Sequence, residues 1–214
     1  MKKQLLAFAA FAAMVVSCTN NNENTSMKDT TSKEEKKELP PPPPLDSVAQ
    51  MKAWQDYSSP SKVHEMIASW NGIWDAENTQ WMDSKAPPAI TKGTATNKMI
   101  LGGRFQEMNY KGEIMGMPFE GIGTLGYDNA LQIFTSTWID NMGTGAMTME
   151  GQWDEATKTI NFKGKSTDPM TKKTMDMREV FTVIDANNQK MEMFGKGIDG
   201  KEFKMMEIKF TRKK

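Results

Sequence analysis

The stretch that decides the fold is SKVHEMIASWNGIWDAENTQW, residues 61–81. Apolar residues recur at helical spacing after Ser61, which is a favourable residue for capping the start of a helix. Asn71-Gly72 is typical of a helix end, and the chain then resumes as a strand at Ile73-Trp74. This order places a large indole at the mouth of a sheet, where it can close one end of a core. A second short helix is predicted just upstream, where Asp46 or Ser47 can cap it.

The chain after Trp74 reads as a succession of short strands. Each is rich in aromatic, Thr, Ile or Met residues, and turn-forming residues separate them at the spacing of antiparallel proteins. Asp199-Gly200, for example, suits a two-residue hairpin. The predicted strands are residues 73–82, 90–100, 104–111, 117–127, 131–139, 145–153, 159–166, 173–184, 189–196 and 202–212.

Alternation assigns one apolar face to each strand. In 202–212, Met206, Ile208 and Phe210 share a face, while Glu207 and Lys209 lie opposite. An open sheet of about ten such strands would leave exposed edges, and no long helical segment separates the strands as in parallel sheets. We therefore predict an all-β fold, an antiparallel up-and-down barrel of about ten strands preceded by one or two short helices.

The N-terminus resembles an export signal. Residues 1–17 have a charged start at Lys2-Lys3, a short apolar run and small residues before Cys18, the single cysteine of the chain. This arrangement resembles the lipobox of bacterial lipoproteins, in which the cysteine becomes lipidated. We predict a lipoprotein signal peptide, lipidation at Cys18 and a membrane-anchored location in the bacterial cell envelope; the alternative is an ordinary cleaved signal.

Residues 18–45 are polar, charged in both signs and end in five prolines, so they cannot bury enough apolar surface to fold. We interpret them as a tether, with a proline-rich partner motif as the alternative. Residues 46–214 are predicted to form a single barrel domain. Removal of Lys2 and Lys3 from 27 basic residues leaves 25 against 27 acidic ones, a net charge of −2. This balance argues against nucleic acid as a partner.

Gly72-Ile73-Trp74 at the first strand and Arg212 at the end of the last strand resemble the signature of the calycins, which include lipocalins and fatty-acid-binding proteins. The resemblance implies that Gly72, Trp74 and Arg212 close one end of the barrel, with the guanidinium stacked on the indole.

A more extensive resemblance runs along the domain, and it is to the bacterial family called domain of unknown function 1579. It implies a lipocalin-like fold and supplies no catalytic residues. The segments that carry it are His64 to Trp74, Leu101-Gly102-Gly103-Arg104-Phe105, Gly116-Met117-Pro118-Phe119-Glu120-Gly121, Gly126-Tyr127-Asp128, Trp138-Ile139-Asp140 and Phe210-Thr211-Arg212-Lys213.

The chain holds twenty methionines, several of them in Met-x-Met pairs such as Met147/Met149. Thioethers gathered on one face could bind Cu(I). Methionine also fills irregular apolar space and makes adaptable walls for apolar ligands, and barrel alternation already requires apolar residues at these positions. We favour core or cavity lining, and we expect no metal and no cofactor.

Polar residues that share a face with apolar ones mark a candidate ligand site inside the barrel. Glu179 lies between Met177 and Phe181, and a buried charge needs a partner, which can be another side chain or a ligand. An internal ion pair or a solvated position at the barrel mouth is the alternative. The candidate ligand-binding residues are Arg104, Met108, Tyr110, Met147, Met149, Met177, Glu179 and Phe181.

No catalytic residues are predicted. The single histidine, His64, has no matched nucleophile nearby in sequence, and the single cysteine is assigned to the lipid. We expect a protein that binds a small hydrophobic or amphipathic molecule. The alternatives are a structural or protein-interaction lipoprotein with a filled barrel, and an enzyme that uses Glu179 or Glu107 as acid or base.

Overall fold

The computed structural model describes residues 46–82, 86–169, 171–197 and 200–214. Within these ranges two helices precede ten strands. The predicted signal peptide, Cys18 and tether lie outside the described residues. The elements are α1 (Ser47–Ser58), α2 (Lys62–Ala68), β1 (Gly72–Gln80), β2 (Ala89–Ile100), β3 (Phe105–Ile114), β4 (Met117–Asp128), β5 (Ile133–Asp140), β6 (Met147–Asp154), β7 (Thr159–Asp168), β8 (Lys173–Val183), β9 (Asn188–Lys196) and β10 (Glu202–Arg212).

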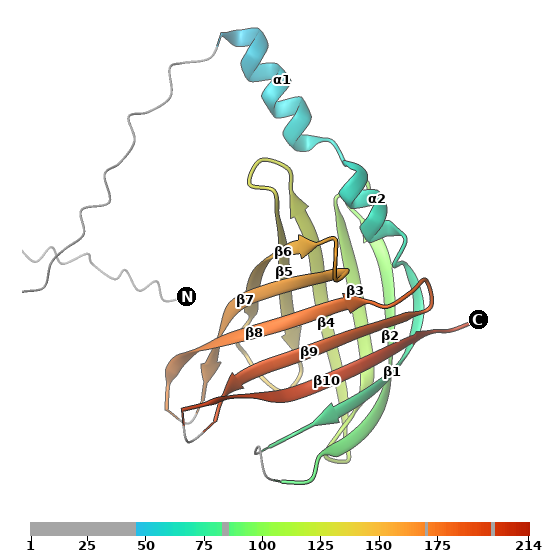
Figure 1. Cartoon of the computed structure of the whole chain (residues 1–214), viewed down its shortest axis with the longest axis vertical. Coiled ribbons are helices and arrows are strands. Elements are labelled where there is room, and N and C mark those ends of the chain that lie inside the picture. The colour runs from blue at the N-terminus through green and yellow to red at the C-terminus, as the bar shows by residue number, and fades with distance from the viewer. Residues whose placement is uncertain (1–45, 83–85, 170, 198–199) are drawn as a thin grey trace, which may run out of the picture. The chain divides into compact units, whose positions relative to one another are not determined.

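The strands form one closed antiparallel barrel of up-and-down topology (Figure 1). Each strand pairs with its neighbours in sequence, and β1 pairs with β10 to complete the circle, with Trp74 opposite Arg212. This confirms the predicted ten-stranded antiparallel up-and-down barrel, and all strand boundaries lie within a few residues of the prediction. Closure satisfies the backbone groups that an open sheet would leave at its edges.

Local sequence explains the tight turns. Met115 and Gly116 connect β3 to β4 with φ angles of 53° and 76°, and Ile114 pairs directly with Met117. Two successive positive φ angles are typical of a type I′ hairpin, which matches the twist of the strands that it joins. A β-bulge interrupts β10 between Lys204 and Met206.

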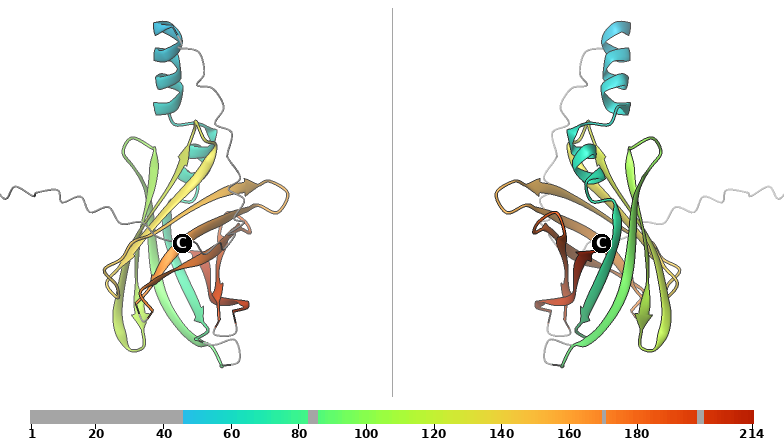
Figure 2. Two further views of the ribbon diagram at one scale, coloured as in Figure 1. Left: turned by 90° about the vertical axis from the view of Figure 1, so that its left-hand side faces the viewer. Right: turned by 90° about the vertical axis from the view of Figure 1, so that its right-hand side faces the viewer.

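The helices differ in how they contact the barrel. Asp46 caps α1 by accepting a hydrogen bond from the Ala49 amide, and none of the residues in α1 is buried. In contrast α2 buries Ile67 against one end of the barrel, and Gln106 of β3 donates to the Ile67 carbonyl at 2.9 Å. Two side views show α2 at one end of the barrel and α1 extending away from it (Figure 2). Neither helix is long and apolar enough to cross a bilayer.

Two apolar clusters pack in the barrel interior. The first joins α2 to β5–β8 through Ile67, Trp70, Phe134, Met149, Ile160, Phe162 and Met177. The second joins β1–β3 to β10 through Trp74, Ala76, Ala95, Tyr110, Ile208 and Phe210. Trp70, from just after α2, contacts the rings of Trp153 and Phe181, so the α2 end of the barrel is filled by side chains.

Candidate functional site

The α2 end of the barrel is closed by Arg212 and Trp74. The guanidinium carbon lies 4.2 Å from the centre of the Trp74 ring, and the indole Nε1 donates to the Trp70 carbonyl at 3.1 Å. Gly72 has a φ of 129°, and a Cβ there would lie 2.8 Å from the Arg212 side chain. A stacked guanidinium and a glycine beside it therefore seal this end.

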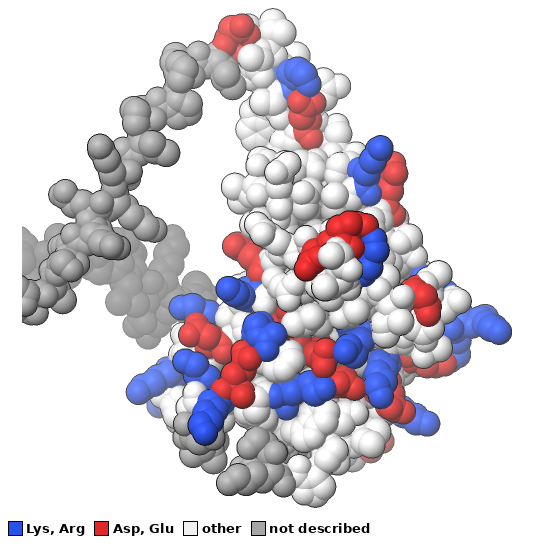
Figure 3. Space-filling model, in the orientation of Figure 1, with Lys and Arg blue, Asp and Glu red and all other residues white. Residues whose placement is uncertain are grey.

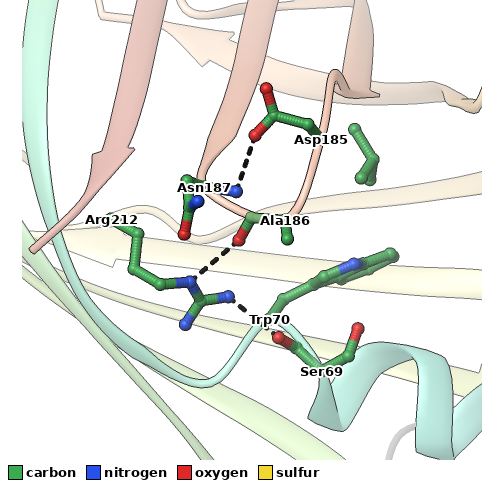
Figure 4. A pocket seen from close by; sticks show the side chains of 7 residues that line it. Ser69, Trp70, Asp185, Ala186, Asn187 and Arg212 are labelled. Atoms are coloured by element: carbon green, nitrogen blue, oxygen red, sulfur yellow. Dashed lines mark hydrogen bonds between the residues drawn. The ribbon is translucent and has the colours of Figure 1, made fainter. Parts of the chain in front are cut away.

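A pocket of about 340 Å³ lies beside this seal (Figure 4). Arg212 donates to the carbonyls of Ala186 and Ser69, each at 2.9 Å, and to that of Asn71. Hydrogen bonds from Asn188 and Asn187 hold the pKa of Asp185 below its usual range. The polar groups that Figure 4 connects by dashed lines already hydrogen-bond to one another at the closed end of the barrel. We therefore interpret this pocket as part of the structural closure and not as a ligand site.

A second pocket, of about 430 Å³, lies in the barrel wall between β8 and β9. The described pairing of these strands stops at Arg178 and Phe194, although β8 continues back to Lys173. Its lining residues are Lys163, Gly164, Lys165, Asp176, Met177, Arg178, Gly195, Lys196 and Glu202. Met177 is buried and belongs to the first apolar cluster, so this wall pocket reaches the interior packing.

The rim of the wall pocket is basic. It carries four basic residues against two acidic ones, a net charge of +2. Arg178 forms a bidentate pair with Glu202, with nitrogen–oxygen distances of 3.0 and 2.6 Å, and stacks on Phe194. On this side of the barrel, basic and acidic side chains intermix over the wall (Figure 3).

Glu179 lies one interior position beyond Met177 on β8. Its neighbours across the two adjacent strands are Phe162 and Met193, both apolar. The residue is 8% exposed, and no described residue donates a hydrogen bond to its carboxyl group or pairs with it. Burial in these surroundings raises the pKa of Glu179 to about 7, because the charged form loses its hydration without a compensating partner. An unpartnered acid at this depth is the most chemically unusual group in the described interior.

Three other side-chain atoms in the described structure are fully buried without a hydrogen-bond partner. They are Asn78 Oδ1, Asn97 Oδ1 and Gln189 Nε2, all on interior-facing positions of β1, β2 and β9. Their burial without a partner is a property of the closed barrel.

The predicted ligand-binding residues divide between the two apolar clusters. Met147, Met149, Met177 and Phe181 belong to the first cluster, close to Glu179 in the sheet. Met108 and Tyr110 pack in the second cluster, and burial raises the pKa of the Tyr110 phenol. These residues do not line one common pocket among the described ones.

The prediction that Arg104 faces the interior is wrong. Arg104 lies in the turn before β3, is exposed, and donates to the Leu101 carbonyl at 3.1 Å. Arg104 is the last residue of the turn 101–104, in which Leu101, Gly102 and Gly103 all have positive φ, so the alternation of β3 begins only after it.

Met205 and Gly195 are missed by the sequence reasoning. The β-bulge in β10 turns Met205 toward the first apolar cluster, where its side chain packs on Gly195. The sulfur of Met177 lies 3.5 Å from the position that a Cβ on Gly195 would take. Lys204 is the sequence signal, since a lysine that interrupts the alternation indicates an irregular strand.

Two other candidates have structural surroundings. The His64 ring accepts a hydrogen bond from the Ser61 amide at 3.0 Å and so caps α2, while burial, the largest effect, lowers the pKa of His64. On the outer face of β3, hydrogen bonds from Lys98 and Asn109 hold the pKa of Glu107 below its usual range, the reverse of what a general acid requires. The described residues contain no group of three or more His, Cys, Asp or Glu side chains that could hold a metal ion.

Comparisons with known proteins give a family and a fold. Residues 59–212 match the family model described as "Protein of unknown function (DUF1579)". The crystal structure of Rv2717c from M. tuberculosis superposes with a TM-score of 0.56 and 10% identity, over 73% of this chain and 100% of that one. The S-type phycobiliprotein lyase CPES from Guillardia theta gives a TM-score of 0.48 and 10% identity, over 71% and 93% of the two chains. A search of curated proteins gives no match.

Proposed function

Because this chain belongs to the DUF1579 family, whose function is not established, we propose from its site that the barrel binds a small amphipathic molecule at the wall pocket between β8 and β9. The apolar part of the molecule packs against Met177 and Gly195, and its polar part reaches Glu179. The lipid anchor at Cys18 belongs to the same proposal, and it holds this binding domain at the cell envelope.

The observation that carries the proposal is the unpartnered carboxyl group of Glu179. A buried ionisable group that no protein atom satisfies costs folding free energy, and such a cost is commonly retained where the group serves a ligand. A hydroxyl, amide or amine of a bound molecule would supply the missing hydrogen bond. Two apolar neighbours, Phe162 and Met193, favour a ligand that is otherwise apolar.

The wall pocket supplies the route. It lies where the described pairing of β8 and β9 stops, so a molecule can enter there without breaking those backbone hydrogen bonds. Met177 lines this pocket and Met205 packs on its lining residue Gly195, and flexible methionine side chains can repack around different shapes. The basic rim favours a ligand that is not itself strongly cationic.

Export and anchoring are supported by the N-terminal sequence pattern. A charged start, a short apolar run and small residues precede Cys18, and the following segment is composed like a flexible tether. Globomycin inhibition of signal processing, or mass spectrometry of the mature N-terminus, tests the anchor separately from ligand binding. An unmodified N-terminus at Met1 would remove the anchor and leave the binding proposal in place.

Ligand binding is tested with the purified chain by native mass spectrometry and by titration with the lipophilic dye Nile red. We expect a bound small molecule or saturable dye binding in the wild type, and weaker binding in Glu179→Gln. Glu113 provides a matched control, because Glu113→Gln makes the same chemical change at a solvent-exposed carboxyl group. A wild type with neither bound molecule nor saturable dye binding refutes the proposal.

A second function is favoured by the packing of large side chains in the interior. Trp70, Phe134 and Phe162 are buried together, as expected of a filled barrel that serves as an interaction module. In that case Glu179→Gln and Glu113→Gln leave every binding measurement equal to that of the wild type.

A further inference from the structure

Helix α1 has an apolar side that nothing in the described structure covers. It is 12 residues long and buries none of them. Val48, Met51 and Trp54 are 77%, 73% and 70% exposed, and Tyr57 packs its ring edge on Trp54 while remaining exposed.

The helix separates charge from apolar surface. At about 100° per residue, the four large apolar residues lie on one half of its circumference, which they share with uncharged polar residues such as Gln50 and Gln55. Lys52 and Asp56, the two charged residues of α1, fall in the other half and pair with each other at 2.7 Å. Much of α1 accordingly carries no charge in the surface view (Figure 3).

Such a helix needs a surface to pack on. Isolated helices of about 12–15 residues are marginal in water, because most helical stability in proteins comes from burying one face. The sequence of α1 is not rich in alanine, and none of its residues is buried in the core. Burial of the large apolar side chains against a partner would therefore stabilise α1.

The C-terminal end of α1 is fixed to the barrel. The Asn129 side-chain amide, in the β4–β5 turn, lies 2.8–3.3 Å from the carbonyls of Asp56, Tyr57 and Ser59. These are carbonyls that the end of a helix leaves without intrahelical partners. Leu131, in the same turn, is 67% exposed.

We propose that α1 docks on the surface of a lipid bilayer, with Met51 and Trp54 inserted at the level of the headgroups. The chain outside the described residues ends at residue 45, so α1 is the first element after the tether that leads from Cys18. A lipid on that cysteine would keep α1 at high local concentration near the bilayer. Trp and Tyr favour the interface between water and hydrocarbon, and a side with no net charge enters it at little electrostatic cost. This inference shares the Cys18 lipid with the proposed function but does not depend on ligand binding.

The test is tryptophan quenching in vesicles of phosphatidylethanolamine and phosphatidylglycerol that carry brominated acyl chains. The lipidated full-length mature protein is reconstituted, and its emission is compared with that in unbrominated vesicles. Trp54 is the most exposed candidate reporter, because Trp70 and Trp74 are buried in the barrel. We expect bromine quenching in the wild type and its loss in Trp54→Phe. Trp81→Phe is the control, since this indole follows β1 at the other end of the barrel.

A second variant tests docking and not merely the reporter. Met51→Ser keeps Trp54 and every described core contact, and it should reduce quenching while flotation with vesicles persists. Anchored protein whose Trp54 is unquenched overturns the proposal. If the wild type does not float with the vesicles, the protein is not anchored. Docking of α1 is then tested with Cys18→Ser protein and excess vesicles. Quenching of Trp54 in that mixture supports docking, and no quenching overturns it. A lipid-free dimer that Met51→Ser dissociates also overturns it, by assigning α1 to a second copy of the chain.

Discussion

Glu179 should make the stability of this domain fall as the pH rises. Its pKa is raised from 4.5 to about 7 in the folded state, so between these values the folded protein holds a proton that the unfolded chain releases. Below the ordinary pKa of 4.5 Glu179 is protonated in both states, and its burial carries no cost from ionisation. The free energy of unfolding then falls as the pH rises through about 7. Each pKa unit corresponds to about 1.4 kcal/mol, which gives a loss of about 3 kcal/mol by about pH 8.

Glu179→Gln removes this dependence. Urea unfolding of ligand-free protein, followed by tryptophan fluorescence at about pH 4.5 and about pH 8, should show the variant gaining about 3 kcal/mol relative to the wild type at the higher pH. Carboxyl groups with lowered pKa values, such as Asp154 and Asp185, lose stabilising interactions at acid pH, but they do so equally in both proteins. Glu113→Gln should keep the wild-type profile. Parallel profiles for wild type and Glu179→Gln would refute the reasoning, because they would show that Glu179 is solvated or paired.

Three further predictions concern the closed end, the wall and α1. Arg212→Ala should lower the free energy of unfolding by about 3 kcal/mol in urea titrations, because it removes the cation–π contact and charged hydrogen bonds, whereas exposed Arg104→Ala should cost about 0.5 kcal/mol or less. A small Arg212 effect would mean that the stacking does not hold the end closed. Gly164→Ala should cost about 2 kcal/mol or more, because its Cβ would meet a backbone carbonyl of β6, and Gly143→Ala should be neutral, since nothing lies within 4 Å. Equal melting temperatures of the two alanine variants would contradict this. Asn129→Ala should speed amide hydrogen exchange in the last turn of α1 without changing the melting temperature; unchanged exchange would show that the amide does not hold the helix end.

Much of the fold follows from local sequence. Period-two alternation located the ten strands within a few residues, and Asn71-Gly72 correctly marked the change from helix to strand. Arg104 was misplaced because alternation was carried into a turn whose φ angles are positive. Met205 was missed because a bulge reverses the faces of a strand, and a bulge depends on the register with the neighbouring strand.

The sequence by itself determined the order of the elements, the side of each strand that is apolar, and the family resemblance that residues 59–212 bear out. These depend on backbone preferences and on side-chain character within a few residues. Only the tertiary structure decided that Glu179 is buried without a partner, that β8 and β9 part at a pocket, and that α1 keeps its apolar side exposed. Such properties depend on which distant segments come together, because burial and pairing are set by closure of the whole sheet and not by any one strand.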